Sequence, residues 1–343
     1  MQIGSTKVGG SAPCFIIAEI AQAHDGSLGS AHAYIDAVAK TGVNAIKFQT
    51  HIASEESSPK DEFRVNIFPQ DKTRYDYWKR MEFSEDQWRD LSNHAKEKGL
   101  IFLSSAFSNE AVRILNSIGM PAWKIASGEI NNFPMIEEMA KSKKPFLISS
   151  GLSSMDEIEQ TLKFIDKLGC ESAVFQCTTS YPCPPEEIGL NLINEMRETF
   201  DRPVGLSDHS GTQYPALAAV ALGVNLLEVH AVFSRDSFGP DTSSSLTIDE
   251  LEDMVKGVRF IESMINSPIN KDDQAESKKE LKALFAKSLY AKSNLSIGYQ
   301  VTKKDVAIKK PGIGIPANNF NNIIGKKLKK AILMDEPYTE DHF

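Results

Sequence analysis

The stretch PFLISSGLSSMDEIEQTLKFIDKLGCESAVFQCTT, residues 145–179, contains the repeating unit that decides the fold. Its two ends, PFLISSG and AVFQCTT, are short apolar runs of the kind that form buried strands. Between them, SMDEIEQTLKFIDKLG has apolar residues at helical spacing, begins on serine and ends on glycine. Strand, helix and strand in this order predict two parallel strands joined by a crossover helix.

The same alternation recurs along most of the chain. Counting the two runs above, eight strand-like runs are present: FIIAEI (from Phe15), AIKFQT (Ala45), IFLSSAF (Ile101), WKIASGE (Trp123), PFLISSG (Pro145), AVFQCTT (Ala173), PVGLSD (Pro203) and LLEVHAVF (Leu226). Eight such units predict an α/β protein with a closed (β/α)8 TIM barrel. An open doubly wound sheet is the alternative, but AQAHDG follows the first run instead of a glycine-rich dinucleotide fingerprint.

The end of the chain has a different character. The polar stretch NSPINKDDQAESKKE follows the last barrel helix and is typical of a linker or an exposed helix. Beyond it, SLYAKS, YQVT and DVAIKK are β-prone, and PGIGIPAN breaks regular structure. We therefore predict a barrel over residues 1–266, a linker over 267–282, and a small β-rich domain with little core of its own over 283–343.

Composition excludes several classes of protein. The chain has 38 Lys and Arg against 46 Asp and Glu, a formal charge of −8, which argues against general affinity for nucleic acid. No apolar run approaches the ~20 residues of a membrane span, and the N-terminus does not resemble a secretory signal. We expect a cytoplasmic protein whose four cysteines, which form no CxxC pair, are reduced packing residues.

Polar residues gather where the predicted strands end, which is the active-site face of a TIM barrel. Because side chains alternate along a strand, Lys47 and Gln49 share a face, as do Ser207 with His209 and Glu228 with His230. So many ionisable groups directed into one barrel mouth indicate a charged ligand or a metal. The remaining strand-end candidates are Glu19, Ser105, Lys124, Ser127, Glu129, Ser149, Thr179 and Tyr181.

His209 and His230 end adjacent predicted strands, so both imidazoles can reach one divalent ion. A pair of hydrogen-bonded structural histidines is the alternative interpretation. Two histidines with open positions for water and substrate oxygens suit Mn2+ or Mg2+ better than a closed zinc site.

Lys47 and Lys124 are candidates to bind a phosphate and a carboxylate, with help from the neighbouring hydroxyls and amide. Each lysine also admits an interpretation as a barrel-rim residue or as a Schiff-base lysine. Glu19, Glu129 and Glu228 are either structural partners of these lysines or groups for proton transfer and hydroxyl binding. Spacing alone does not choose between these roles.

Several motifs together resemble the sialic acid (nonulosonic acid) synthase family. They are AEI…HDG, KFQTH, WKIASGE, CTTSYP, GLSDHS, EVHAVF and FGPD in the barrel, with KKPGIGI and IIGKKL in the tail. The resemblance implies a transferase that forms a C–C bond between phosphoenolpyruvate and an N-acylated hexosamine. It also implies an antifreeze-like (SAF) C-terminal domain, a domain-swapped homodimer, and a divalent metal, with Mn2+ first and Mg2+ or Co2+ as alternatives.

The resemblance also implies roles for individual residues. His209 and His230 correspond to the metal ligands. Glu19, Glu129, Glu228, Tyr181 and Asp241 correspond to positions that contact the amino sugar or serve acid–base steps. The phosphoenolpyruvate site corresponds to Lys47, Gln49, Ser105, Lys124, Ser127, Ser149, Tyr181 and Ser207, with Thr179 where the family often has Asn.

The chain departs from the family pattern in three places. Ala21, Gln22 and Ala23 stand where the family usually has Gly-x-Asn, and Thr242 stands where it usually has His. Lys310 replaces an Arg that would reach the acyl group of the partner's substrate, and a point charge does not reproduce a bidentate fork. The departures concern the identity of the hexosamine. Two alternative functions stay open: another phosphoenolpyruvate-condensing synthase that uses a phosphorylated sugar, and a non-catalytic protein that binds through its antifreeze-like domain.

Overall fold

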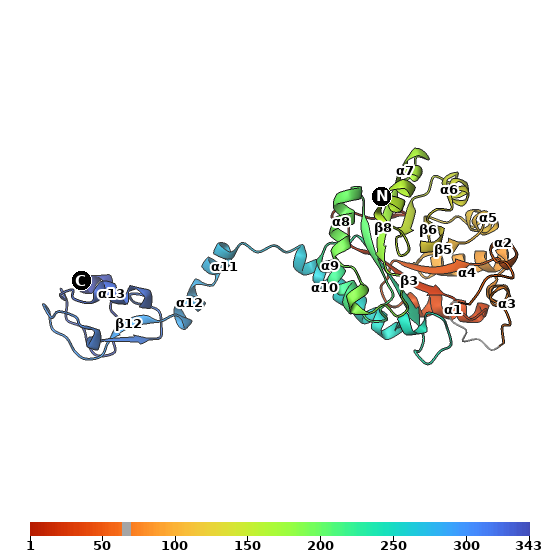
Figure 1. Ribbon diagram of the computed structural model, residues 1–343. Coiled ribbons are helices and arrows are strands. Elements are labelled where there is room, and N and C mark those ends of the chain that lie inside the picture. The colour runs from red at the N-terminus through yellow and green to blue at the C-terminus, as the bar shows by residue number, and fades with distance from the viewer. Residues whose placement is uncertain (64–69) are drawn as a thin grey trace. The chain divides into compact units, whose positions relative to one another are not determined.

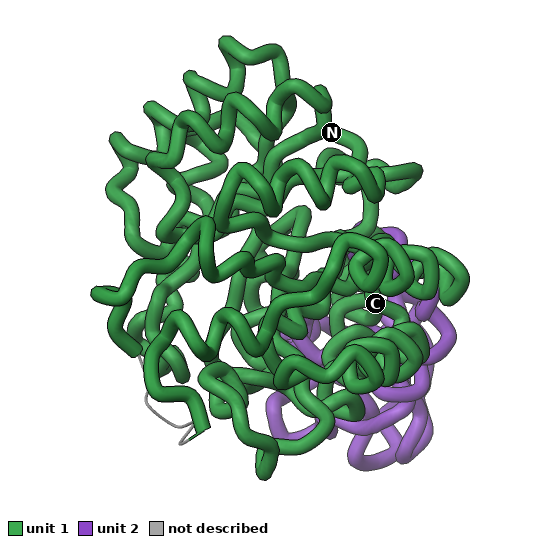
Figure 2. Tube along the Cα trace, turned by 90° about the vertical axis from the view of Figure 1, so that its right-hand side faces the viewer, with its two compact units in different colours: residues 1–266 green, residues 267–343 purple. Residues whose placement is uncertain are grey.

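The structure is a computed structural model that describes residues 1–63 and 70–343. The chain divides into two compact units, Met1–Asn266 and Ser267–Phe343 (Figure 2). Each unit has its own cluster of buried apolar side chains. Each is therefore described by itself.

The first unit is a closed barrel of eight parallel strands, as predicted (Figure 1). Each strand pairs with its neighbours in chain order, and the last pairs with the first, so the ring has no open edge. This closure excludes the open doubly wound sheet. All eight predicted runs form strands: β3 (Phe15–Ala21), β4 (Ala45–Thr50), β5 (Ile101–Ala106), β6 (Trp123–Ile125), β7 (Phe146–Ser149), β8 (Ser172–Cys177), β9 (Val204–Asp208) and β10 (Leu226–Val232).

One helix follows each strand on the outside of the barrel, and local sequence signals begin most of these helices. Reciprocal side-chain caps from Ser84, Ser154 and Thr247 start three of them, and Ser27, Ser108 and Asn132 cap three others. The outer helices are α1 (Leu28–Val38), α4 (Glu85–Glu97), α5 (Asn109–Ser117), α6 (Phe133–Ala140), α7 (Met155–Lys167), α8 (Asn191–Phe200), α9 (Tyr214–Ala221) and α10 (Ile248–Ile265).

Shorter elements complete the first unit. The hairpin of β1 (Gln2–Ile3) and β2 (Thr6–Lys7) buries Ile3, and β11 (Ser245–Thr247) adds to β10. Two helices, α2 (Ala53–Glu56) and α3 (Arg74–Met81), are inserted between β4 and α4. Of the described helices, none is both long and apolar enough to cross a membrane.

The second unit begins with α11 (Lys271–Ser277) and α12 (Lys279–Phe285) in the stretch predicted as a linker or exposed helix. It continues with the antiparallel pair β12 (Ser288–Ala291) and β13 (Val306–Lys309) and the short helix α13 (Phe320–Ile323). Its core is larger than expected. Irregular segments contribute buried residues to it one at a time, such as Leu295, Val301, Ile332 and Tyr338. Such isolated residues give no periodic pattern that a sequence reading can detect.

Candidate active site

A small inner pocket lies at the carboxyl ends of the barrel strands. The period-two alternation of the strands directs polar side chains into it, while their apolar neighbours pack outward against the helices. The pocket unites most of the predicted site residues: Glu19, Lys47, Gln49, Ser105, Lys124, Ser127, Ser149, Tyr181, Ser207, His209, Glu228 and His230. Ala126 and Cys177 complete its lining.

Two lysines and two glutamates form a buried charge cluster in this pocket. Lys47 pairs with Glu19, and its ammonium also lies 3.8 Å from Glu228. Lys124 lies 3.1 Å from Glu228 and donates to Ser149 Oγ at 2.6 Å. Glu19 and Glu228 are thus ion-pair partners of the lysines, which is one of the two roles that the sequence left open.

The two carboxylates have opposite pKa shifts. Burial raises the pKa of Glu19 to about 7 against the lowering effect of Lys47. Burial would also raise the pKa of Glu228, but Lys124 and Lys47 outweigh it and lower that pKa to about 2. One carboxyl group is therefore suited to hold a proton near neutral pH while the other stays ionised.

His209 and His230 lie side by side at the ends of β9 and β10, with ring centroids 5.2 Å apart. His209 Nδ1 is 2.8 Å from the carbonyl oxygen of Thr178, so it carries the proton and leaves the Nε2 lone pair near Tyr181 Oη at 3.2 Å. Burial, together with His230, lowers the pKa of His209 to about 3, so the ring is neutral. A neutral imidazole is the form that binds a metal.

Asp241 Oδ2 lies 3.9 Å from His230 Nδ1. Within residues 1–63 and 70–343, no group of three or more His, Cys, Asp or Glu side chains is arranged around one metal position. A cation here would therefore be held by two imidazoles and would need further oxygen ligands from water or substrate.

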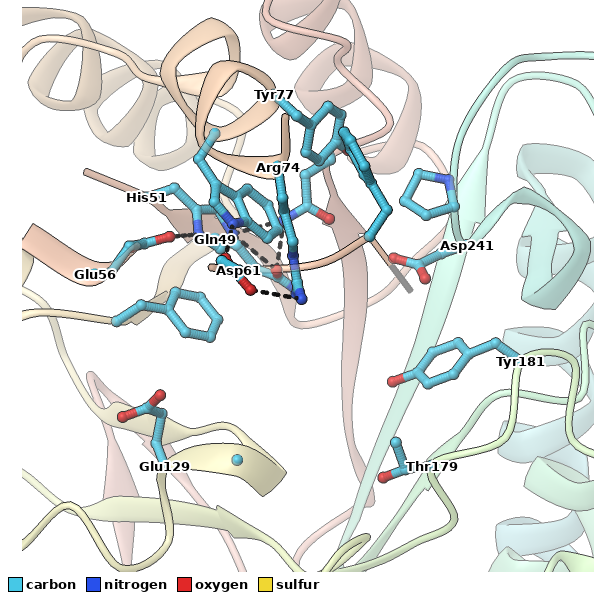
Figure 3. Close-up of a pocket in the computed structure, with 16 residues that line it drawn as sticks. Gln49, His51, Glu56, Asp61, Arg74, Tyr77, Glu129, Thr179, Tyr181 and Asp241 are labelled. Carbon is cyan, nitrogen blue, oxygen red and sulfur yellow. Dashed lines mark hydrogen bonds and ion pairs between the residues drawn. The ribbon is translucent and has the colours of Figure 1, made fainter. Parts of the chain in front are cut away.

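A larger outer cavity of about 390 Å3 shares Gln49 and Tyr181 with the inner pocket (Figure 3). The predicted residues Glu129, Thr179 and Asp241 line this cavity instead of the inner pocket. Glu129 accepts a hydrogen bond from Asn132 at 2.8 Å, so it is separate from the lysine cluster. Lys310 belongs to the second unit, where its ammonium lies 5.1 Å from the ring centroid of Phe285.

Helices α2 and α3 supply part of the outer wall, which the sequence reading missed. Arg74 donates to Asp61 at 3.1 Å, and the indole nitrogen of Trp78 donates to the same carboxylate at 3.3 Å (Figure 3). The ring of His51 is stacked between Trp78 and Phe107, with centroid distances of 3.8 and 4.4 Å. His51 directly follows β4, so its strand-end position was a usable signal, whereas Arg74 and Trp78 are on no strand.

The two parts of the chain resemble a known protein family and a known domain. The chain matches the NeuB family over residues 34–270 and the SAF domain over residues 286–343. The chain belongs to the NeuB family. The barrel that carries both pockets is the part that matches this family, and the SAF match falls in the second unit.

Relatives of this NeuB family chain have similar length. It is 34% identical to N-acetylneuraminate-9-phosphate synthase of Homo sapiens, over 97% of this chain and 94% of that protein. It is 31% identical to N,N'-diacetyllegionaminic acid synthase of Legionella pneumophila, over 93% and 92% of the two chains. The solved structure of N-acetylneuraminic acid (sialic acid) synthetase from Leptospira borgpetersenii, in complex with citrate, is 28% identical with a TM-score of 0.73, covering 82% of this chain and 96% of that one.

Proposed function

We propose that this protein is a nonulosonic acid synthase, a transferase that condenses phosphoenolpyruvate with an N-acylated hexosamine and releases phosphate. Membership of the NeuB family supports the proposal, as do relatives named for the synthesis of N-acetylneuraminate 9-phosphate and N,N'-diacetyllegionaminic acid. The relatives are named for different products, so the hexosamine must be identified by experiment.

The observation that carries the proposal is the inner pocket. Two buried ammonium groups, Lys47 and Lys124, face four serine hydroxyls, which is the donor set that a phosphate and a carboxylate need. Glu19 pairs with Lys47, and Glu228 pairs with Lys124. A small anion that enters would share the ammonium groups with the two carboxylates.

The proposed reaction balances without a redox partner. Carbon C3 of phosphoenolpyruvate bonds to the aldehyde carbon of the open-chain sugar, and the aldehyde oxygen takes a proton. Water adds at C2 and gives up one proton, which balances the proton taken by the aldehyde oxygen. The bond between C2 and the phosphate oxygen then breaks as the C2 hydroxyl becomes the keto oxygen, and phosphate leaves with the second proton. In this scheme the lysines hold the phosphate and the carboxylate, and Glu19 or Glu129 transfers the protons.

We propose that His209 and His230 bind a divalent cation, with Mn2+ preferred over Mg2+ or Co2+. The neutral ring of His209 and the adjacent ring of His230 fit such an ion as nitrogen donors, with oxygen ligands from water or substrate. When bound, the cation supplies Lewis-acid polarisation of the sugar aldehyde.

The outer cavity is the proposed hexosamine site. Its described lining combines aromatic side chains with the carboxylates of Glu56, Asp61, Glu129 and Asp241, and its one described guanidinium, Arg74, is engaged by Asp61. This acidic lining favours a sugar rich in hydroxyl and amide groups over the phosphorylated sugar of the alternative synthase. The structures of two 3-deoxy-D-arabino-heptulosonate 7-phosphate synthases share only the fold, at 13% identity.

We also propose a domain-swapped homodimer in which Lys310 reaches the partner's hexosamine, and a cytoplasmic location. Exposed apolar residues on the second unit, including Leu284, Phe285 and Ile313, support an intermolecular contact. The four cysteines form no disulfide bonds, which is the state that the reducing cytoplasm maintains.

A phosphate-release assay tests the proposed function. Purified protein is incubated with Mn2+, phosphoenolpyruvate and each member of a panel that contains N-acetylmannosamine and diacetamido-trideoxyhexoses. We expect inorganic phosphate with at least one acceptor, and mass spectrometry should show a sugar acid longer by three carbons. Release with none of the acceptors would reject the synthase and favour a non-catalytic role.

A further inference from the structure

His51 and Glu56 lie outside the inner pocket, yet a continuous set of hydrogen bonds joins them to it. His51 Nδ1 lies 2.5 Å from Glu56 Oε1, and His51 Nε2 lies 2.8 Å from Gln22 Nε2. Gln22 Nε2 also donates to Gln49 Oε1 at 2.5 Å, and Gln49 Nε2 donates to Glu19 Oε1 at 3.0 Å. The pocket wall is thereby connected to the carboxylate that pairs with Lys47.

The chemistry of the end groups sets the direction of every bond in this chain. Ionised Glu56 only accepts, so His51 Nδ1 carries a hydrogen and donates it. His51 Nε2 lies 2.8 Å from the amide nitrogen of Gln22 and 3.2 Å from Gln49 Oε1. In the tautomer that donates from Nδ1, Nε2 accepts from the nearer amide nitrogen. The two hydrogens of the Gln22 amide are then used on His51 and Gln49, which leaves the Gln49 amide nitrogen to donate to Glu19.

The backbone and the packing hold this network in place. Register between β3 and β4 shifts between Glu19 and Ala21, and Ala21 has φ +48°, so the chain turns and Gln22 becomes buried against the wall. Trp78 and Phe107 stack on both faces of the His51 ring. Glu56 Oε2 also accepts from the backbone nitrogen of Ile52 at 3.2 Å, which fixes the carboxylate.

We propose that His51 and Glu56 are positioning residues of the active site. Glu56 selects the His51 tautomer, and His51 orients Gln22 so that the Gln49 amide presents its nitrogen, and not its oxygen, to Glu19. This inference rests on the proposed function, in which Glu19 is a candidate for proton transfer. Without the network, the amide of Gln49 is free to turn over, and its oxygen would face a carboxylate.

Two substitutions at His51 separate positioning from packing. His51→Phe keeps the aromatic stack but removes both hydrogen bonds. His51→Gln removes the stack, but its Oε1 is three bonds from Cβ, as is the imidazole Nε2, and it accepts from Gln22. We expect His51→Phe to lower kcat roughly tenfold, with the KM for phosphoenolpyruvate unchanged within about twofold because Lys47 and Lys124 remain. We expect His51→Gln to retain more activity than His51→Phe.

Glu56→Leu should lower kcat as His51→Phe does, and the double variant should be no worse than either single one. The matched control is His94→Phe, which breaks a histidine–carboxylate contact of 3.3 Å with Asp36 on the outer helices and should leave kcat unchanged. A melting temperature for each variant excludes loss of folding as the cause.

Wild-type kcat in His51→Phe, or more activity in His51→Phe than in His51→Gln, overturns the positioning role. A crystal structure of His51→Phe gives a readout that needs no turnover. The proposal expects Gln49 Nε2 to leave hydrogen-bond distance of Glu19, and an unmoved Gln49 overturns it. If the wild type releases no phosphate with any acceptor, the proposed function fails by itself, and the crystal structures alone decide the positioning role.

Discussion

At the scale of single residues, the buried ion pair of Lys124 and Glu228 couples stability to ligand binding. Lys124→Met leaves Glu228 with the more distant ammonium of Lys47, 3.8 Å away, and the hydroxyl of Ser207 at 3.2 Å. We expect the free energy of unfolding to fall by about 3 kcal/mol, because a buried charge loses its partner. Chemical denaturation measures this change.

The double variant Lys124→Met with Glu228→Gln is the control, since it removes both charges. It should recover most of the lost stability but should release no phosphate, because the ammonium that binds the substrate is still missing. A double variant as unstable as the single one would show that the ion pair is not the cause of the loss.

His24 provides a prediction about pH. Its Nδ1 accepts from the Gly26 backbone, its Nε2 has no hydrogen-bond partner among residues 1–63 and 70–343, and burial, with His51 and Arg80, lowers its pKa to about 3. The unfolded chain has the ordinary pKa of about 6.5 and binds a proton that the folded state does not. Stability contributed by neutral His24 is complete above about pH 6.5 and is lost progressively between about pH 6.5 and 3.

His24→Asn keeps an acceptor for Gly26 and removes the titrating group. The slope of unfolding free energy against pH in this window should be steeper for the wild type by up to about 1.4 kcal/mol per pH unit. Denaturation curves at a series of pH values give both slopes. Parallel slopes for the two proteins would rule out a neutral His24 in the folded state.

At the scale of elements, the strands and the outer helices were predictable because their signals are local. Alternation, capping serines and terminal glycines lie within the segments that they organise. Helices α2 and α3 gave weaker signals: α2 has only four residues and no side-chain cap, and α3, although Thr73 and Asp76 cap it, has charged side chains at half of its positions. Their positions depend on contacts with other parts of the chain, such as Arg74 with Asp61.

Helix α7 tests the local signals directly. Ser154 accepts from the backbone nitrogen of Glu157, and the Glu157 side chain accepts from the backbone of Ser154. Ser154→Ala should lower the free energy of unfolding by about 1 kcal/mol, because a helix-start amide loses its partner. Ser153→Ala, one residue earlier, does not remove the cap and should stay within about 0.5 kcal/mol of wild type. Equal effects would mean that the cap contributes nothing.

At the scale of the whole molecule, the proposed dimer predicts complementation between two inactive variants. His230→Ala removes one of the two proposed metal ligands of the barrel, and Lys310→Ala removes the residue that the second unit is proposed to lend to a partner. In a mixed dimer, the intact barrel of one chain meets the intact second unit of the other. Each mixed dimer therefore has one intact site and one doubly defective site, so purified mixed dimers should show about half of the wild-type activity.

The measurement is phosphate release by mixed dimers purified through two different tags, with light scattering to give the mass. Lys309→Ala, which alters a neighbouring lysine that pairs with Asp335, is the control for Lys310→Ala and should keep its activity. If co-expression restores nothing although the chains do form dimers, Lys310 does not act across the dimer.

The amino-acid sequence by itself determined the barrel and the identity of its inner lining. Lys47, Gln49, Ser207, His209, Glu228 and His230 point inward because strand geometry alternates with a period of two, and that rule needs no knowledge of other segments. The carboxyl-end position of the site follows from the barrel topology in the same way.

Only the tertiary structure decided which charges pair and what surrounds them. The pairing of Lys124 with Glu228 joins β6 to β10, two strands that are not neighbours in the ring, and so depends on how far side chains reach across the barrel interior. His51 meets Gln22, Trp78 and Phe107 through turns and an inserted helix, whose packing is set by distant contacts. Periodicity places a side chain on one face of its own strand, whereas its partners are fixed only when the whole chain has closed around the pocket.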